Sequence, residues 1–176
     1  LDGYEETLRS FAKQMVLPEV ARDPRKVAIV GLLWDRNEWD NRANLVELRR
    51  MFDSVGLELV SVWLSGSPFA ELDRAAEAGT IISLPYGRKA AEILAKRTGA
   101  TRLDLPLPLG LTASELWMEK LGEISGKSAE AKAFVEKELG SIVPRMEFVI
   151  PYQMQNINVG YVGDPHMLPG INDMLE

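Results

Sequence analysis

The sequence predicts an α/β protein, a doubly wound parallel sheet in a Rossmann-like three-layer sandwich. Short apolar runs alternate with helical patterns of about 10–15 residues, which is the rhythm of βαβ units. The run VAIVGLLW at 27–34 is continuously apolar, as expected of a strand that helices cover on both faces. Glycines such as Gly56 and Gly99 follow helical patterns, at the position where helices commonly end.

The individual elements follow from these patterns. Strands are predicted at residues 27–33, 58–64, 80–84, 101–105 and 158–162. Helices are predicted at 2–15, 43–55, 69–78, 87–98, 112–124 and 128–139, with a partial helix at the end of the chain. Thr112 and Glu115 have the spacing of a capping box, and Pro144 is expected to kink or end the helix that begins at Ser128.

Composition excludes several classes of function. A length of 176 residues suits one domain, and the net charge of −6 makes nucleic acid an unfavourable partner. No apolar run reaches the roughly 18 residues that span a bilayer, and no signal peptide is visible. The chain has no cysteine and a single histidine, His166. This segment therefore holds no disulfide, no catalytic thiolate, no cysteine-ligated iron–sulfur cluster and no site that needs two histidines.

Nucleotide motifs are also absent. The sequence after the first predicted strand, GLLWDRNEWD, has one glycine where a dinucleotide fingerprint needs three, and no Walker A loop occurs. Asp35, Glu38 and Asp40 form an acidic group whose oxygens could bind Mg²⁺ or Ca²⁺. Their spacing matches no EF-hand, and we favour the interpretation as a solvated loop. Trp39 in the same polar loop is a candidate for an interface, whereas Trp63 is expected in the core.

Ligands of open α/β sheets bind outside the carboxyl ends of the strands. The loops at 34–44, 65–69, 85–88, 106–111 and 163–168 are predicted to form that rim. Tyr86 can donate a hydrogen bond or stack, Gly87 permits close approach to the backbone, and His166 can change charge near neutral pH. With Ser65 and Gly163 from the same rim, these are the candidate cofactor-binding residues. The alternative is that each loop is an ordinary turn.

An ordered set of segments carries a family resemblance. They are VAIVGLLWDR at 27–36, NLVELRRMFDSVGLELVSVW at 44–63, SGS-x₃-EL at 65–72, ISLPYGRKAAEIL at 82–94, LPLPLGLTASELWMEKLGEISGK at 105–127 and VGYVGDPHMLPGI at 159–171. Together they resemble the nitrogenase component 1 family. That family includes subunits of the nitrogenase iron-molybdenum protein, cofactor-assembly scaffolds and light-independent protochlorophyllide reductases.

The resemblance implies a piece of a longer subunit. Residues 1–24 are then an exit helix and linker from a preceding domain, and 25–176 a Rossmann-like middle domain that stops within a helix. The chain's start at a residue other than methionine agrees with this interpretation. The fragment itself is expected to hold no cofactor and not to be catalytic.

For the parent protein, the resemblance implies a cytoplasmic oxidoreductase subunit. An iron–sulfur cluster would be held by cysteines of the first domain, and a metallocluster or tetrapyrrole would lie between domains. The expected partners are a homologous component 1 subunit and an ATP-dependent iron–sulfur reductase, with neither nucleic acid nor membrane.

The resemblance also bears on two positions of the rim. Pro85 stands where the catalytic nitrogenase subunit has a cofactor-ligating cysteine, so this chain resembles a subunit that does not ligate the cofactor there, or a tetrapyrrole-reductase relative. His166 falls in a loop that lies near the cofactor in the catalytic nitrogenase subunit. The resemblance implies this location for His166 but no role. A non-catalytic assembly scaffold and an unrelated small-ligand-binding domain remain alternatives.

Overall fold

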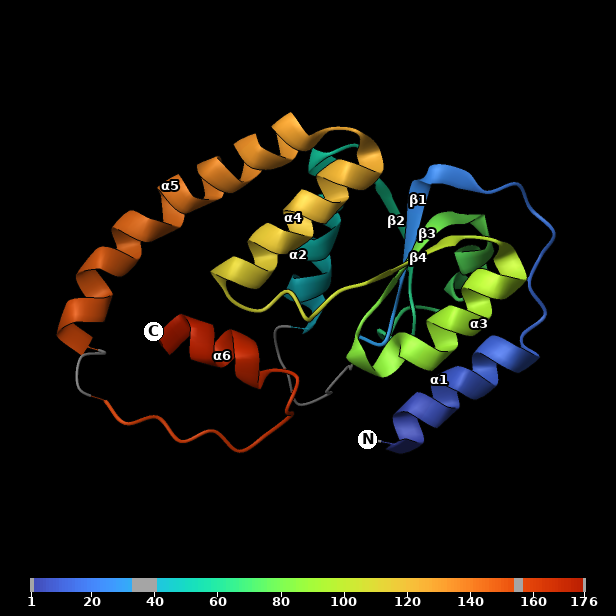
Figure 1. The fold of residues 1–176 in the computed structure, drawn as a ribbon, viewed down its shortest axis with the longest axis horizontal. Coiled ribbons are helices and arrows are strands. Elements are labelled where there is room, and N and C mark those ends of the chain that lie inside the picture. Colours follow the sequence, from blue (N-terminus) through green and yellow to red (C-terminus); the bar gives the residue numbers. More distant parts are fainter. Residues whose placement is uncertain (1, 33–40, 154–156, 176) are drawn as a thin grey trace. The chain divides into compact units, whose positions relative to one another are not determined.

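The computed structural model of the chain describes residues 2–32, 41–153 and 157–175. These form two compact units, Leu1–Leu107 and Pro108–Glu176. The ribbon in Figure 1 shows that the first contains the strands and the second is built from helices. Each unit is described by itself.

The first unit is built on a parallel sheet. Its strands are β1 (Asp23–Val30), β2 (Glu58–Val62), β3 (Ala78–Ser83) and β4 (Thr101–Asp104). Their order is β2-β1-β3-β4, and every neighbouring pair is parallel. The chain moves from β1 outward to β2 and then returns to place β3 on the other side of β1. The predicted doubly wound parallel sheet is therefore confirmed.

Helices cover both faces of this sheet (Figure 1). Helices α1 (Asp2–Gln14) and α3 (Arg88–Thr98) lie on one face, and α2 (Asn41–Ser54) lies on the other. On the α1–α3 face, Leu8 and Leu94 pack in one fully buried cluster with Val30 and Ile81 of the two central strands. Burial of such side chains is the main favourable contribution to folding, at about 25 cal/mol per Å² of apolar surface.

Polar contacts also fasten α1 to α3. The Arg97 guanidinium donates to the carbonyl oxygens of Ala12 at 2.5 Å and Met15 at 2.7 Å, where α1 leaves carbonyls without helical partners. At the other end of α1, Lys89 Nζ lies 2.9 Å from Glu5 Oε2. Helix α1 thus shares its core and its ends with the sheet unit. The domain boundary predicted at residue 24 concerns a longer protein and stays a prediction.

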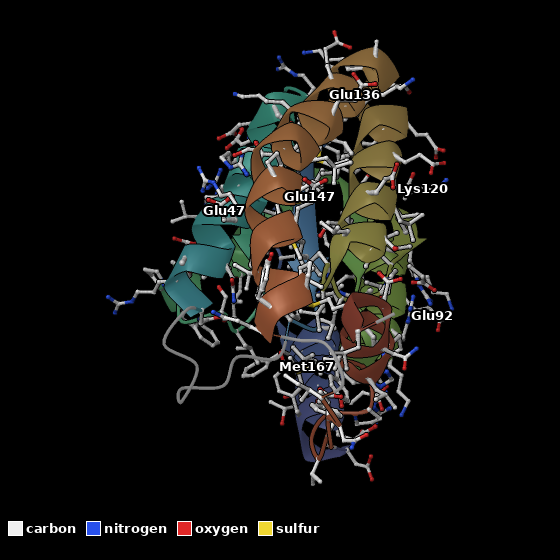
Figure 2. The ribbon with its side chains drawn as sticks, turned by 90° about the vertical axis from the view of Figure 1, so that its left-hand side faces the viewer. Glu47, Glu92, Lys120, Glu136, Glu147 and Met167 are labelled. Atoms are coloured by element: carbon white, nitrogen blue, oxygen red, sulfur yellow. The ribbon has the colours of Figure 1, made fainter. Side chains whose placement is uncertain are left out.

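The second unit is helical in its described part. Its helices are α4 (Leu111–Ser125), α5 (Ser128–Gln153) and α6 (Leu168–Leu175). Gly122 lets α4 and α5 approach closely, because a Cβ there would lie 2.9 Å from Ala131 Cβ. In Figure 2, the labelled side chains Glu136 and Glu147 of α5 are among the exposed acids of this unit. Among the residues that the structure describes, no helix is long and apolar enough to cross a membrane.

Two predicted elements are wrong. Residues 157–162 form no strand, and Ile157, Val159 and Val162 are exposed by 56%, 56% and 101%. Alternating apolar residues make a strand only where a neighbouring strand supplies hydrogen bonds. The helix predicted at 69–78 is instead two short 3₁₀ turns, Phe69–Glu71 and Asp73–Glu77, because Ala78 already belongs to β3 and pairs with Asp23 of β1.

One predicted helix end is wrong, and the helix with a predicted kink or end at Pro144 does not end there. Helix α4 has Gly110 as its N-cap without a side-chain bond, and the Thr112 hydroxyl donates instead to Asp173 Oδ1 at 3.0 Å. No capping box forms. Helix α5 continues through Pro144 and Pro151 to Gln153. A proline removes one backbone donor from a helix and crowds the preceding turn, which favours a kink without always ending the helix.

Candidate functional site

The strand order reverses between β1 and β3, which makes their carboxyl ends the topological switch point of the sheet. Strand β1 ends at Val30 and β3 at Ser83. The pairing continues one step further, where the Leu84 amide donates to the Val30 carbonyl at 2.9 Å. The chain leaves the sheet on both sides of this point, so the side chains that follow the two strands form the candidate site.

Two glycines let the backbones of the loops after β1 and β3 pack directly against each other. Gly31 has φ of +98°, and a Cβ on it would lie 2.3 Å from the Gly87 nitrogen. A Cβ on Gly87 would lie 2.0 Å from the Val30 carbonyl oxygen. Side chains do not fit at such distances. Gly87 was predicted to admit a ligand, and the structure shows that its own chain makes a close approach there. Its role in binding a cofactor stays a prediction.

The turn Pro85–Gly87 carries the candidate Tyr86 into this rim. Its three residues form a 3₁₀ turn that leads directly into α3, with Gly87 as the N-cap and no side chain bonded to the cap. The N-terminus of α3 therefore lies at the switch point, where the helix dipole favours negative charge. Tyr86 is half-buried beside it.

Arg88, the first residue of α3, carries positive charge at the same place. Its Nη1 lies 2.9 Å from Asp104 Oδ1, and its Nη2 donates to the Leu105 carbonyl at 3.5 Å. Asp104 also accepts from Arg102 at 2.6 Å. The hydrogen bond from Arg102, helped by Arg88, lowers the pKa of Asp104 below its ordinary value. Asp104 thus stays ionised near neutral pH and compensates the two guanidinium groups.

Tyr4 belongs to this rim although it lies on α1. Its hydroxyl donates to the Leu32 carbonyl at 2.8 Å, and its ring meets the Tyr86 ring edge-on with centroids 6.2 Å apart. Burial raises the pKa of Tyr4 to about 12. The sequence indicates a helix over residues 2–15 but gives no signal that Tyr4 reaches loops far along the chain. Tyr4 was therefore missed.

Ser65 follows β2 at the edge of the same sheet. Its Oγ donates to the Val62 carbonyl at 2.8 Å and lies 3.4 Å from Ser67 Oγ. Leu64 before it has φ of +56°, a left-handed conformation that costs a non-glycine residue on the order of 1 kcal/mol or more. The buried Ser65 hydroxyl thus stabilises its own strained turn. Its part in cofactor binding stays a prediction.

Gly163 and His166 lie in the second unit. The Asp164 side chain accepts from the His166 amide at 2.9 Å, and the Asp164 carbonyl accepts from the Tyr161 hydroxyl at 2.9 Å. A Cβ on Gly163 would lie 2.5 Å from the Tyr161 hydroxyl, so a larger residue there would displace the Tyr161 ring. His166 is exposed. The structure brings Tyr86 and Gly87 together at the switch point, and the convergence of all five candidates on one rim stays a prediction.

The tryptophans and acids named from the sequence fall into two groups. Trp63 is fully buried and donates from Nε1 to the Leu72 carbonyl at 3.2 Å, as a core tryptophan should. The acidic group at 35, 38 and 40 and the interface candidate Trp39 lie outside the described residues.

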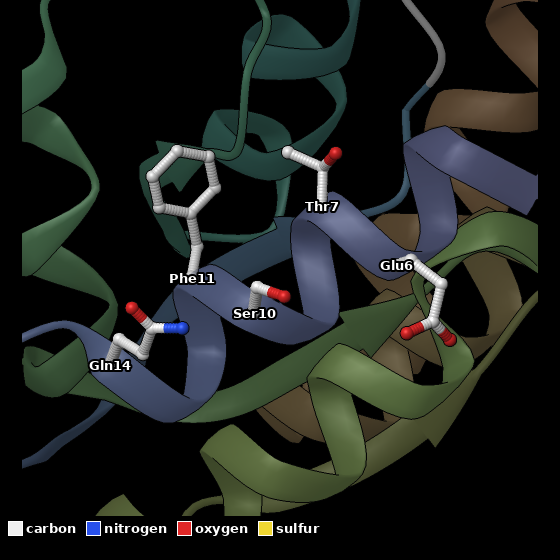
Figure 3. A pocket seen from close by; sticks show the side chains of 5 residues that line it. All are labelled: Glu6, Thr7, Ser10, Phe11 and Gln14. Atoms are coloured by element: carbon white, nitrogen blue, oxygen red, sulfur yellow. The ribbon is translucent and has the colours of Figure 1, made fainter.

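Two hollows of the described surface lie away from the switch point, one on α1 and one where β1, α2 and β2 meet, lined by Asp23, Arg25, Asp53, Gly56, Leu57 and Glu58. One of about 310 Å³ lies on the outer side of α1, and Figure 3 shows its lining of Glu6, Thr7, Ser10, Phe11 and Gln14. All of these come from a single helix. Binding sites are usually concave and receive polar groups from several elements. Over the described residues, no three acidic or histidine side chains gather as metal ligands.

Comparison with known proteins gives one finding about the whole chain. The family model of nitrogenase component 1 type oxidoreductases matches residues 1–176. A search of the curated proteins found no match.

Proposed function

Because the chain belongs to the nitrogenase component 1 type oxidoreductase family, we propose that it forms one wall of a metallocluster or tetrapyrrole site in a multi-subunit reductase. The observation that carries this proposal is the rim at the β1–β3 switch point. There the turn Pro85–Gly87 presents Tyr86 beside the N-terminus of α3. Parallel sheets bind their ligands at such points.

The residues of this chain do not fit a cluster that they would ligate themselves. Thiolates hold iron–sulfur clusters, and the sequence contains no cysteine. The ligands of any cluster would therefore come from other parts of the assembly, and this chain would contribute surface. Pro85, at the position of the cofactor-ligating cysteine in the catalytic nitrogenase subunit, agrees with that role.

The same rim fits a tetrapyrrole, with its carboxylates and aromatic ring, better than it fits a metallocluster. Carboxylates are favoured at the N-terminus of a helix, and the N-terminus of α3 has no side-chain cap. The half-buried ring of Tyr86 can stack on a planar ligand or donate to it. His166 and Ser65 are further candidates for contact in this proposal. Bound there, a tetrapyrrole would supply the conjugated ring that accepts electrons.

The proposal extends to partners. A homologous component 1 subunit would complete the site, and an ATP-dependent iron–sulfur reductase would supply the electrons in the cytoplasm. The alternative role within the same family is a scaffold that holds a cofactor precursor without turnover. The match over the whole chain removes the third interpretation, an unrelated small-ligand-binding domain.

Anaerobic purification of the tagged parent protein from its native cells tests the proposal. We expect an iron–sulfur centre or bound tetrapyrrole, a homologous subunit, and reduction of the bound group that depends on ATP and the reductase partner. Bound cofactor without turnover would indicate the scaffold. An intact assembly that holds neither iron, sulfide nor tetrapyrrole would refute both roles.

Two substitutions locate the site within that assembly. Tyr86→Phe and His166→Ala should each weaken cofactor retention or turnover, while the matched surface variant Glu136→Gln on α5 should not. If both variants behave like the wild type in an intact assembly, a hydrogen bond from Tyr86 and a contact from His166 to the cofactor are both excluded. Gly87→Ala is unsuitable here, because its Cβ would meet the Val30 carbonyl at 2.0 Å.

A further inference from the structure

One side chain of α1 contacts both loops of the switch point. The Tyr4 hydroxyl bonds to the Leu32 carbonyl, two residues beyond the end of β1, at 2.8 Å. The Tyr4 ring meets Tyr86, three residues beyond the end of β3, at an interplanar angle of 81°. Tyr4 thus links α1 to the two loops that flank the proposed ligand.

The backbone beneath this link is rigidly packed. Gly31 and Gly87 leave no room for a Cβ between the loops, and the Gly87 amide donates to the Leu84 carbonyl at 2.8 Å. The positions of the two loop backbones are therefore fixed by their own contact. What this contact does not fix is the direction of the Tyr86 side chain, which depends on the rings and chains around it.

The Tyr4 hydroxyl keeps its role as donor over the whole working range of pH. Burial raises its pKa to about 12, so it stays protonated and neutral. Ion pairs from Lys89 to Glu5 at 2.9 Å and to Glu6 at 3.6 Å hold the next residues of α1 over the first turn of α3. The ring of Tyr4 is thus held at two points, by its own hydroxyl and by the helix that carries it.

We propose that Tyr4 is a positioning residue, whose bond to Leu32 and edge-on contact with Tyr86 set the orientation of the Tyr86 ring at the rim. The significance of Tyr86 as a ligand contact rests on the proposed function, whereas its orientation by Tyr4 does not. Without the hydroxyl bond, the Tyr4 ring loses its second point of attachment, and Tyr86 samples more orientations.

Fluorine NMR of the 176-residue chain labelled with 3-fluorotyrosine tests this directly. The four tyrosines give four signals, which single Tyr→Phe variants assign. Tyr4→Phe should shift or broaden the Tyr86 signal, and Tyr4→Leu, which also removes the ring, should change it more. Thr7→Val is the matched control, because it removes a hydroxyl-to-carbonyl bond of 2.7 Å from the same helix without touching Tyr86.

Circular dichroism of each variant confirms that the fold is kept. If Tyr86 keeps its signal position and line width in both folded Tyr4 variants, the proposal is overturned. If Thr7→Val alters the Tyr86 signal as much as Tyr4→Phe does, the effect belongs to α1 as a whole, and the proposal is overturned as well.

Titration of the same samples with protoporphyrin IX separates this proposal from the proposed function. We expect the probe to move the Tyr86 signal of the wild type, and Tyr4→Phe to weaken its binding by the factor by which the binding-competent orientation of Tyr86 becomes rarer. If the probe leaves Tyr86 unmoved while Tyr4→Phe still changes its signal, the positioning by Tyr4 stands and the tetrapyrrole site fails.

Discussion

The two units of the chain reach stability by different means. In the first, strands far apart in the sequence pair with one another, and core side chains of the strands and of α3 are fully buried, as for Ile29, Ile82 and Leu94. In the second, helices α4 and α5 follow one another directly. Helix α5 leaves Val143, Val149 and other apolar side chains exposed. Nonlocal pairing thus gives the first unit a core of its own.

Charge divides along the same boundary. The first unit has 16 acidic and 15 basic residues, a net charge of −1, and the second has 10 and 5, a net charge of −5. Together these give the −6 of the chain. The β1–β3 switch point, with Tyr86 and the N-terminus of α3, therefore lies in the electrostatically balanced, well-packed unit. A rigid scaffold of that kind is suited to holding catalytic or binding loops in place.

The largest expected difference between the units concerns apolar truncation. Leu94→Ala should cost about 2–5 kcal/mol of unfolding free energy, because it leaves a cavity in the closed core of the first unit. Val149→Ala on α5, at a position 41% exposed, should change it by less than about 0.5 kcal/mol. Urea denaturation followed by circular dichroism measures both. Equal losses of unfolding free energy in the two variants would contradict the difference in packing between the two units.

Glycine substitutions should have opposite signs in the two units. Gly87→Ala should destabilise the chain by about 1–3 kcal/mol or more, because the Val30 carbonyl occupies the space of its Cβ. Gly140→Ala lies within α5 with nothing within 4 Å of its Cβ, and should stabilise it by roughly 0.5–1 kcal/mol. Denaturation midpoints of the two variants, compared with the wild type, give the signs. A destabilising Gly140→Ala would show that α5 is packed more tightly than described.

The link between α1 and α3 should contribute less. Arg97→Met keeps much of the apolar stem but loses the hydrogen bonds to the Ala12 and Met15 carbonyls, at a cost of about 1–2 kcal/mol. Hydrogen exchange should show faster opening of α1, with the strands of the sheet still protected. Lys96→Met is the control on the same helix, since its contact is a solvent-exposed pair with Glu92. Similar exchange of α1 in both variants would show that the hydrogen bonds from Arg97 do not hold α1 in place.

The parts of the fold that the sequence could predict are those set by local pattern. The apolar run of β1 and the glycine that ends α3, Gly99 with φ of +74°, were both confirmed. The strand predicted at 158–162 is wrong, because an alternating apolar pattern says nothing about a partner strand. Pro144 was predicted to kink or end α5, and the helix does not end there, because a proline removes one backbone donor but does not decide whether the neighbouring turns continue.

The candidate site shows the same limit. A glycine at position 87 indicated that some group approaches the backbone closely there. The sequence could not show that this group is the Val30 carbonyl of the same chain. Tyr4 gave no signal at all, because its contacts with Leu32 and Tyr86 span 28 and 82 residues of sequence. Contacts of that kind depend on the strand order, which local patterns do not determine.

The smallest expected effect concerns pH and the ion pair at the amino ends of the strands. The hydrogen bond from Lys26 of β1 lowers the pKa of Glu77, whose Oε2 lies 2.5 Å from Lys26 Nζ. A carboxyl with a lowered pKa in the folded state stabilises the fold above its unfolded pKa of about 4.3, and this contribution is lost as pH falls through the folded pKa. The wild type should therefore lose slightly more stability between pH 6 and pH 3 than Glu77→Gln does. Lys26→Met should show the same reduced pH dependence, because Lys26 is the main cause of the shift. Urea midpoints at both pH values measure the difference, and an unchanged pH dependence in both variants would refute the assignment.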